Sequence, residues 1–337
     1  MTRMENDSVL SYRTSLFINS SLDLLHEEPS LALASRVLFW ILSITGLFAN
    51  FIVIYVIIKH RKILLKIPSN NLLLCLVITD IACVCILIAI RCANLAMEQD
   101  DDVTAVLVSS DSLFASCEVV LSNWTVTAIA VFNYLGVAYP IKFRIFATKK
   151  KVTTIVVCIW LLATSVSIPV IFFPKIKNFV INPEHLIMED IYIYYLIILD
   201  VLSNVPPVLA IVILYPMILY NLIMKHEQHS RSDSFRKKMY SSIKYISFTY
   251  VLFLMYASFN LAITLTLFSF LATDQLSEIP IPESAKRSLR FMAFMEPSIV
   301  FHTVLNPFLH ALLTENFKKY YVPSCWKTKE SVSITNT

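Results

Sequence analysis

The sequence predicts an all-α membrane protein: a bundle of seven transmembrane helices followed by a short amphipathic eighth helix. Hydrophobic residues make up 57% of the 337 positions and charged residues only 15%, a more apolar composition than that of an ordinary globular domain. The apolar residues also gather in seven long stretches. A helix of about 20 apolar residues crosses a hydrocarbon core of about 30 Å while satisfying its own backbone hydrogen bonds.

The seven expected spans are separated by polar loops. They cover residues 37–58, 71–90, 112–138, 152–173, 191–224, 243–271 and 291–313. The third stretch is predicted to be the central helix, because it is strongly apolar yet carries Asp111, Glu118, Ser122 and Asn133 at several depths. Polar groups at membrane depth normally face the interior of a helix bundle, so we expect the other spans to pack around this one.

Basic residues predict the orientation of the bundle. Most of the 28 Lys and Arg residues lie after the first, third, fifth and seventh spans, whereas acids gather in the N-terminal segment and at positions 98–102. The positive-inside rule makes the basic side cytoplasmic, which places the N-terminus outside the cell. The net charge of +4 reflects this loop bias and gives no sign of nucleic-acid binding.

This topology divides the chain into an extracellular segment 1–35, a bundle 36–313, an amphipathic eighth helix 314–323 and a cytoplasmic tail 324–337. Asn6 and Asn19 each begin an Asn-x-Ser pattern, an acceptor for N-glycosylation on the extracellular side. Cys325 follows the eighth helix. Palmitoylation there would fasten that helix to the bilayer, and an unmodified thiol is the alternative.

Short motifs recur at fixed places along the spans. The motif residues are Asn50 and Val53, Leu76 and Asp80, Trp160 and Pro169, Pro207 and Tyr215, and Asn306 and Pro307, with Phe317-Lys318-Lys319 after the seventh span. In order and spacing they resemble the rhodopsin-like (class A) G-protein-coupled receptors, and the resemblance covers all seven spans. It implies a plasma-membrane receptor that binds an extracellular ligand and signals to a cytoplasmic G protein by helix rearrangement.

Other positions depart from the family pattern. Asn133, in Phe132-Asn133-Tyr134, replaces the arginine of the family's Asp-Arg-Tyr, and His310 replaces the tyrosine that follows Asn-Pro. The sixth span lacks the Trp-x-Pro switch. Val108 is nearest to the position of the expected outer cysteine, so the family's extracellular disulfide cannot form. These losses predict a divergent member that senses a chemosensory small molecule or a peptide.

A buried polar set is expected at mid-depth in spans two, three and seven. It comprises Asp80, Glu118, Ser122, His302, Thr303 and Asn306. An unpaired carboxylate at this depth costs at least about 2.5 kcal/mol and requires a cation, a proton or hydrogen-bond donors. By resemblance this is the family's sodium pocket, with Asp80 and Ser122 at ligand positions. Glu118 either strengthens cation binding or is protonated or paired with a polar neighbour.

A ligand pocket is expected nearer the outer surface. Its candidate residues are Asp111, Ala115, Ser116, Val119, Asp200, Ser203, Met255, Tyr256, Phe259 and Glu296. The acids favour a cationic ligand, and an apolar cavity with a few polar groups is the usual form of such a site. Ala115 stands where amine receptors carry their aspartate, which argues against a monoamine. Retinal is excluded as a cofactor because residues 291–313 contain no lysine for a Schiff base.

On the inner face we expect the cavity that a heterotrimeric G protein or arrestin enters. The interface and switch candidates are Asn133, Tyr134, Tyr139, Lys142, Tyr215, Arg236, Lys237, Lys238, Pro307 and His310. The run Lys149-Lys150-Lys151 is more typical of contact with lipid headgroups than of a partner site.

Three functions are compared on these grounds. A ligand-gated receptor that signals through a G protein is favoured. The alternative is an atypical receptor with weak or no coupling, which is arrestin-biased, scavenging or constitutive. A transporter is disfavoured because no internal repeat pairs the halves. An enzyme is disfavoured because no metal-binding or nucleophile motif with suitable spacing stands out.

Overall fold

The computed structural model describes residues 29–96, 101–170 and 184–228, single positions between 243 and 262, Pro297, and residues 300–307. The predictions made for several residues and for the eighth helix lie outside this part. These residues are Asn6, Asn19, Arg236, Lys237, Lys238, Tyr256, Phe259, Glu296, His310 and Cys325. The predicted division of the chain into four segments therefore stays a prediction.

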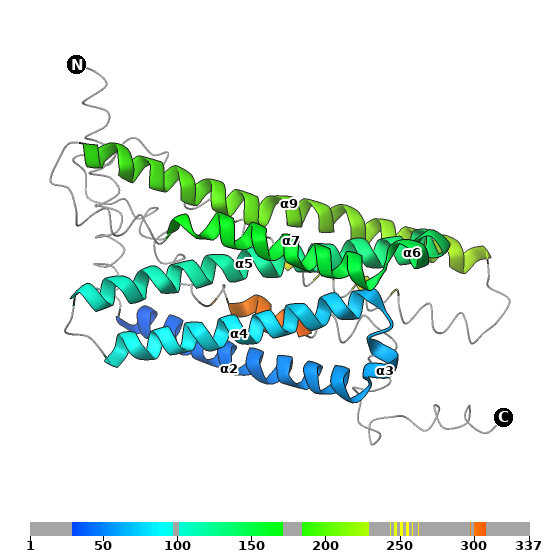
Figure 1. Ribbon diagram of the computed structural model, residues 1–337, viewed down its shortest axis with the longest axis horizontal. Coiled ribbons are helices and arrows are strands. Elements are labelled where there is room, and N and C mark those ends of the chain that lie inside the picture. The colour runs from blue at the N-terminus through cyan, green and yellow to red at the C-terminus, as the bar shows by residue number, and fades with distance from the viewer. Residues whose placement is uncertain are drawn as a thin grey trace, which may run out of the picture.

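The described part of the chain is helical apart from short turns (Figure 1). Its helices are α2 (Pro29–Lys59), α3 (Arg61–Leu64), α4 (Pro68–Ala96), α5 (Asp101–Ala138), α6 (Pro140–Phe146), α7 (Lys149–Ser167) and α9 (Glu184–Gln228). Within this part, α2, α4, α5, α7 and α9 are long and apolar enough to cross a membrane, in agreement with the first five predicted spans. The chain is also helical at every described position of the sixth and seventh.

Several helix ends differ from the predicted spans, and α5, for example, begins at Asp101 and not at residue 112. α2 begins at Pro29, before the predicted start of the bundle at residue 36. α7 ends at Ser167, short of the predicted end at residue 173, and a turn at Ile168 follows it. Pro169 lies directly after this turn, and a proline has no N–H to donate to the carbonyl four residues earlier.

The helix α5 is the centre of the bundle, as the sequence predicts. It packs against α4, α6, α7 and α9. Figure 1 shows it between the pair α2 and α4 on one side and the pair α7 and α9 on the other. Its interior face includes the buried apolar residues Val120, Leu121 and Phe132. We refer below to the two ends of the bundle as the Asp111 end and the Asn133 end.

Proline chemistry shapes the Asn133 end. α5 stops at Ala138 and the chain turns at Tyr139, because Pro140 has no N–H with which to continue the helix. Pro140 is then the first residue of α6, where a missing N–H costs nothing. The ring of Phe143 in α6 packs edge-on against Phe132 of α5 at a centroid distance of 5.7 Å, which fixes the short helix beside α5.

Proline also frees a carbonyl inside α9. In an uninterrupted helix the residue at position 207 would donate its N–H to the carbonyl of Ser203, but Pro207 has none. Asn123 of α5 donates to this carbonyl at 3.2 Å and to the side-chain oxygen of Asn204 at 2.9 Å. A buried carbonyl without a partner is costly in a dry bundle, so Asn123 stabilises both the interrupted helix and its packing on α5.

Helix α2 lies very close to the segment 300–307. The amide of Asn50 donates to the carbonyl of Gly46 in its own helix and to the carbonyl of Thr303, both at 2.9 Å. A Cβ atom at Gly46 would lie 2.5 Å from Thr303 Oγ1. The hydroxyl of Thr303 donates to the carbonyl of Val300 at 2.7 Å and is fully buried, so it cannot easily move away. A glycine is therefore required where these helices meet.

We predict that Gly46→Ala destabilises the protein by about 1–3 kcal/mol, because the added methyl group forces α2 away from Thr303. Gly136→Ala is the matched control. A Cβ there meets only the ring of Phe143 at 3.5 Å, an ordinary contact, so this change leaves stability equal or raises it by up to about 1 kcal/mol. Thermal melting of both variants, purified in detergent, measures the difference. Equal melting temperatures would show that the contact between α2 and Thr303 is looser than described.

Candidate functional site

A network of three polar side chains joins α4, α5 and the segment 300–307 in the bundle interior. The amide of Asn306 donates to Asp80 Oδ2 at 3.1 Å and to Ser122 Oγ at 2.8 Å. All three residues are buried. Because each comes from a different helix, the network holds the three helices at one relative position.

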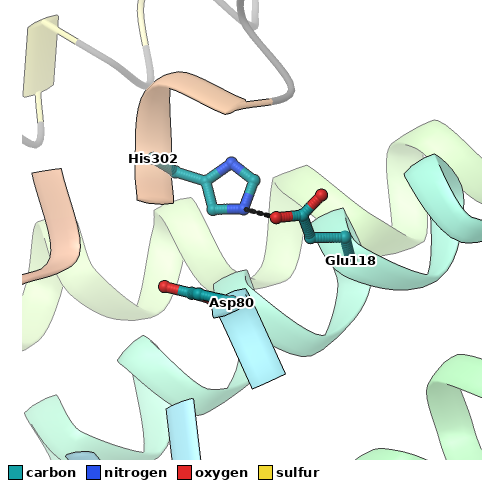
Figure 2. Close-up of side chains that lie close together, drawn as sticks. All are labelled: Asp80, Glu118 and His302. Carbon is teal, nitrogen blue, oxygen red and sulfur yellow. Dashed lines mark ion pairs between the residues drawn. The ribbon is translucent and has the colours of Figure 1, made fainter. Parts of the chain in front are cut away.

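Glu118 and His302 extend this network toward the Asp111 end. Figure 2 shows Asp80, Glu118 and His302 converging from three helices. His302 Nε2 lies 3.7 Å from Glu118 Oε1, which is longer than a hydrogen bond. One ligand atom from each of the three residues lies within 4.8 Å of the others. Neither oxygen of Glu118 has a hydrogen-bond partner in the described part of the chain, and the same holds for Asp80 Oδ1.

The predicted polar set is largely brought together. Asp80, Ser122 and Asn306 are in direct contact, and Glu118 and His302 lie beside them. Thr303 is the exception, because its hydroxyl donates to Val300 and lies against α2 at Gly46. The cluster presents two carboxylates and an imidazole in a dry interior, which is the chemistry of a site for a cation.

At the Asp111 end, the predicted acid is already paired. Asp111 accepts two hydrogen bonds from Arg91 of α4, at 3.3 Å from Nε and 2.8 Å from Nη2. The two side chains are 19% and 20% exposed. The guanidinium also lies 4.5 Å from the ring centroid of Phe39 in α2. Arg91 therefore neutralises the charge with which Asp111 was expected to attract a cationic ligand.

The other ligand-pocket candidates have separate surroundings. Asp200 accepts a hydrogen bond from the Asn204 amide at 2.7 Å, and the buried hydroxyl of Ser203 donates to the carbonyl of Leu199. Ala115 packs in an apolar cluster with Phe39, Val84, Leu87 and Val300. Ser116 and Val119 are partly buried.

Met255 does not fit the predicted pocket. It is 65% exposed and lies one helical turn after Val251, which is 53% exposed. Residues four apart share one face of a helix, so both lie on an outward face of the sixth span. The prediction that Met255 lines the ligand site is therefore wrong.

At the Asn133 end, the helices line a partly open cavity of about 330 Å³. It is lined by Ile67, Ser69, Asn70, Leu73, Ile129, Phe132, Asn133, Gly136, Val137, Phe143, Tyr215, Ile218, Leu222 and Ile246. The walls are mostly apolar, with Asn133 among the few polar groups. The ring of Tyr215 stacks on that of Tyr250 at 5.8 Å, which connects α9 to the sixth span beside the cavity.

Only some of the residues predicted for the G-protein interface line this cavity. Asn133 and Tyr215 line the cavity. Tyr134, Tyr139 and Lys142 do not line it, although the rings of Tyr134 and Tyr139 meet edge-on at 6.3 Å. Pro307 is buried next to Asn306 and also lies away from the cavity walls.

Comparison with known proteins decides the family. Residues 49–310 match the family described as "7 transmembrane receptor (rhodopsin family)". The chain belongs to this family. It is also similar to the type-1 angiotensin II receptor A of Xenopus laevis, with 22% identity over 322 residues that cover 90% of this chain and 84% of that protein. The chain is therefore a multi-pass membrane receptor and not an enzyme.

Two residues with clear roles in this rhodopsin-family receptor escaped the sequence analysis. Arg91 could have been found as a basic residue inside an apolar span, because such a charge needs a partner from a neighbouring helix. Asn123 stands next to Ser122 in α5, and its role follows from the carbonyl that Pro207 frees in α9. That partnership required the helix packing to be known.

We predict that the Arg91–Asp111 pair couples α4 to α5 by about 1.5–3 kcal/mol, since it is a largely buried, charge-assisted pair. A double-mutant cycle with Arg91→Ala, Asp111→Ala and the double variant, measured by thermal melting, gives this coupling energy. Lys59, which contacts Tyr55 at the exposed end of α2, supplies a control basic residue whose change to alanine has little effect. A coupling energy near zero would mean that the pair does not join the helices.

Proposed function

We propose that this rhodopsin-family receptor lies in the plasma membrane with its N-terminus outside, binds an extracellular ligand at the Asp111 end, and activates a heterotrimeric G protein at the Asn133 end. The cavity beside Asn133 is the observation that carries this proposal. The basic residues that follow the first, third, fifth and seventh spans support the orientation.

We infer that the cavity, once widened, accepts the apolar face of a partner helix. Its walls are apolar with a few polar groups, which is what the apolar face of an amphipathic helix requires. Four of its sides come from α4, α5, α6 and α9, and Ile246 contributes from the sixth span. Outward movement of the sixth span would widen the cavity and disturb the Tyr215–Tyr250 stack. A ligand that binds the wider state more tightly would then promote coupling.

A peptide is the ligand class that we favour. Support comes from the relative in Xenopus laevis, which is named as a receptor for the peptide angiotensin II. The pairing of Asp111 with Arg91 weakens the argument for a small cationic ligand, because one of the three acids on which that argument rests is neutralised. A chemosensory small molecule is the second class, and both would enter at the Asp111 end.

We further propose that a cation at Asp80, Ser122 and Asn306 stabilises one of the receptor's two states. Family resemblance implies sodium for this place. The free oxygen of Asp80 and the convergence of three helices support a bound cation, because it would hold those helices together in the state that binds it.

An atypical receptor with weak or no G-protein coupling is the second candidate. It is favoured by Asn133, a neutral amide in the cavity where the family pattern has arginine. In that case arrestin is the cytoplasmic partner. The exposed lysines at the start of α7, Lys149, Lys150 and Lys151, suit contact with lipid headgroups under both proposals.

The test is G-protein activation in cells that display the receptor at their surface, measured for every G-protein class with a broad panel of peptides and small molecules. Activation of at least one class is expected. Silence in all classes at confirmed surface expression, together with arrestin recruitment, would replace the first candidate with the second.

We predict that Asn133→Arg raises basal activation about fivefold, the shift that roughly 1 kcal/mol of added contact with the G protein produces. The side chain lines the cavity, so an arginine there reaches a docked helix. Asn133→Gln is the control, since it lengthens the side chain without adding charge. Activation that does not rise above the parent, at equal surface expression, would contradict a G-protein site at Asn133.

A further inference from the structure

Glu118 and His302 are not needed for the contact among Asp80, Ser122 and Asn306, which is complete without them. Glu118 is nevertheless fully buried, at 0% exposed, and neither of its oxygens accepts a hydrogen bond from the described residues. Its carboxylate points toward the imidazole of His302 (Figure 2). A carboxylate in this position is costly to bury unless a cation, a proton or a hydrogen-bond donor compensates its charge.

The charge of the cluster favours a divalent ion over a monovalent one. Asp80 and Glu118 together supply two carboxylates in one dry site. No lysine or arginine pairs with either of them among the residues described, and the nearby Arg91 is engaged by Asp111. Sodium would balance one of the two negative charges, whereas a doubly charged cation balances both.

The spacing of the ligand atoms favours a small ion. Zinc binds histidine nitrogen and carboxylate oxygen at about 2.0–2.2 Å in tetrahedral geometry, which holds neighbouring ligand atoms about 3.4 Å apart. His302 Nε2 and Glu118 Oε1 lie 3.7 Å apart, too far for a hydrogen bond and close to this separation. All three ligand atoms lie within 4.8 Å of one another. A small contraction of the cluster would therefore bring all three to bonding distance from a single ion.

The ligand types favour the same class of ion. One imidazole nitrogen with two carboxylate oxygens suits zinc and similar transition metals. Calcium prefers six to eight oxygen ligands, and magnesium prefers an octahedral shell with several waters. Three ligands that include a nitrogen, in an interior built from α4, α5 and the segment 300–307, fit neither preference.

We propose that Asp80, Glu118 and His302 bind a divalent transition-metal ion of the zinc class in preference to sodium. This rests on the proposed cation site at Asp80, but it does not depend on G-protein coupling. The ion links three helices through direct bonds and thereby stabilises the state in which those helices are together. Zinc is thus a regulator of the receptor's switching and not a catalyst.

The experiment measures metal binding by the full receptor, purified in detergent, stripped with a chelator and dialysed against zinc at physiological sodium concentration. We expect one tightly bound zinc per receptor and a raised melting temperature. Cobalt in place of zinc gives a visible spectrum that reports tetrahedral coordination. Glu118→Gln and His302→Gln each remove one ligand, so we expect affinity to fall at least about 100-fold, beyond what loss of a supporting residue costs.

The controls separate this site from other zinc-binding groups. His60→Gln removes a histidine at the end of α2, outside the cluster, and should leave the tight zinc in place. Glu118→Gln keeps the side-chain shape while removing a buried charge, so the metal-free variant should melt no lower than the metal-free parent. If Glu118→Gln expresses poorly, His302→Gln alone tests the same group of metal ligands.

Two results would overturn the proposal. Unchanged tight zinc in both ligand variants would place the metal elsewhere on the chain. Stabilisation by sodium that is lost in Asp80→Asn and kept in His302→Gln, with no tight zinc in the parent, would assign the site to sodium. Because binding is measured without a G protein, a receptor that proves silent in cells does not alter either result.

Discussion

The amide of Asn306 is the contact on which the bundle interior depends. Its two donated hydrogen bonds, to Asp80 and to Ser122, join three helices that are far apart in the sequence. Inside a membrane the hydrophobic effect does not favour contact with another helix over contact with lipid, because both are apolar. Polar contacts and close packing therefore decide which helices meet. Two interior polar residues of α5 illustrate this: Ser122 meets the segment 300–307 and Asn123 meets α9. α5 is central because it carries these groups on several faces.

Side chains of α5 make two directional contacts with neighbouring helices, one near the outer end of the helix and one at a proline of α9. The absence of a cysteine near Val108 removes the extracellular disulfide that the family pattern leads one to expect. At the same end, Asp111 is joined to Arg91 of α4 by a two-point ion pair, with the guanidinium also lying over Phe39 of α2. Farther along, Pro207 leaves a carbonyl of α9 without its helical donor, and Asn123 supplies one. The Arg91–Asp111 pair and the hydrogen bond from Asn123 are both directional polar contacts, which are strong where the local dielectric constant is low.

The two ends of the bundle differ in a way that suits a switch. At the Asp111 end, the Arg91–Asp111 ion pair and an apolar cluster that includes Ala115 and Val300 hold the helices together. The Asn133 end contains the cavity, and there Ile246 and Tyr250 of the sixth span pack against an apolar cluster, with Tyr250 stacked on Tyr215. The buried cluster of Asp80, Glu118 and His302 lies between the two ends, where a bound ion would influence both.

The sequence by itself determined the class of the protein and the helix at its centre. Apolar length and composition predict membrane spans because the backbone must satisfy its hydrogen bonds within each helix, a requirement that is local. The polar positions of α5 likewise predicted its place, since buried polar groups must face other helices. The tertiary structure alone decided the partners. It placed Arg91 on Asp111, which cancels the charge expected to attract a ligand, turned Met255 outward, and directed Thr303 toward Gly46. Those outcomes depend on helix rotation and on contacts across more than 200 residues of sequence, as between Asp80 and Asn306, and no local pattern contains them.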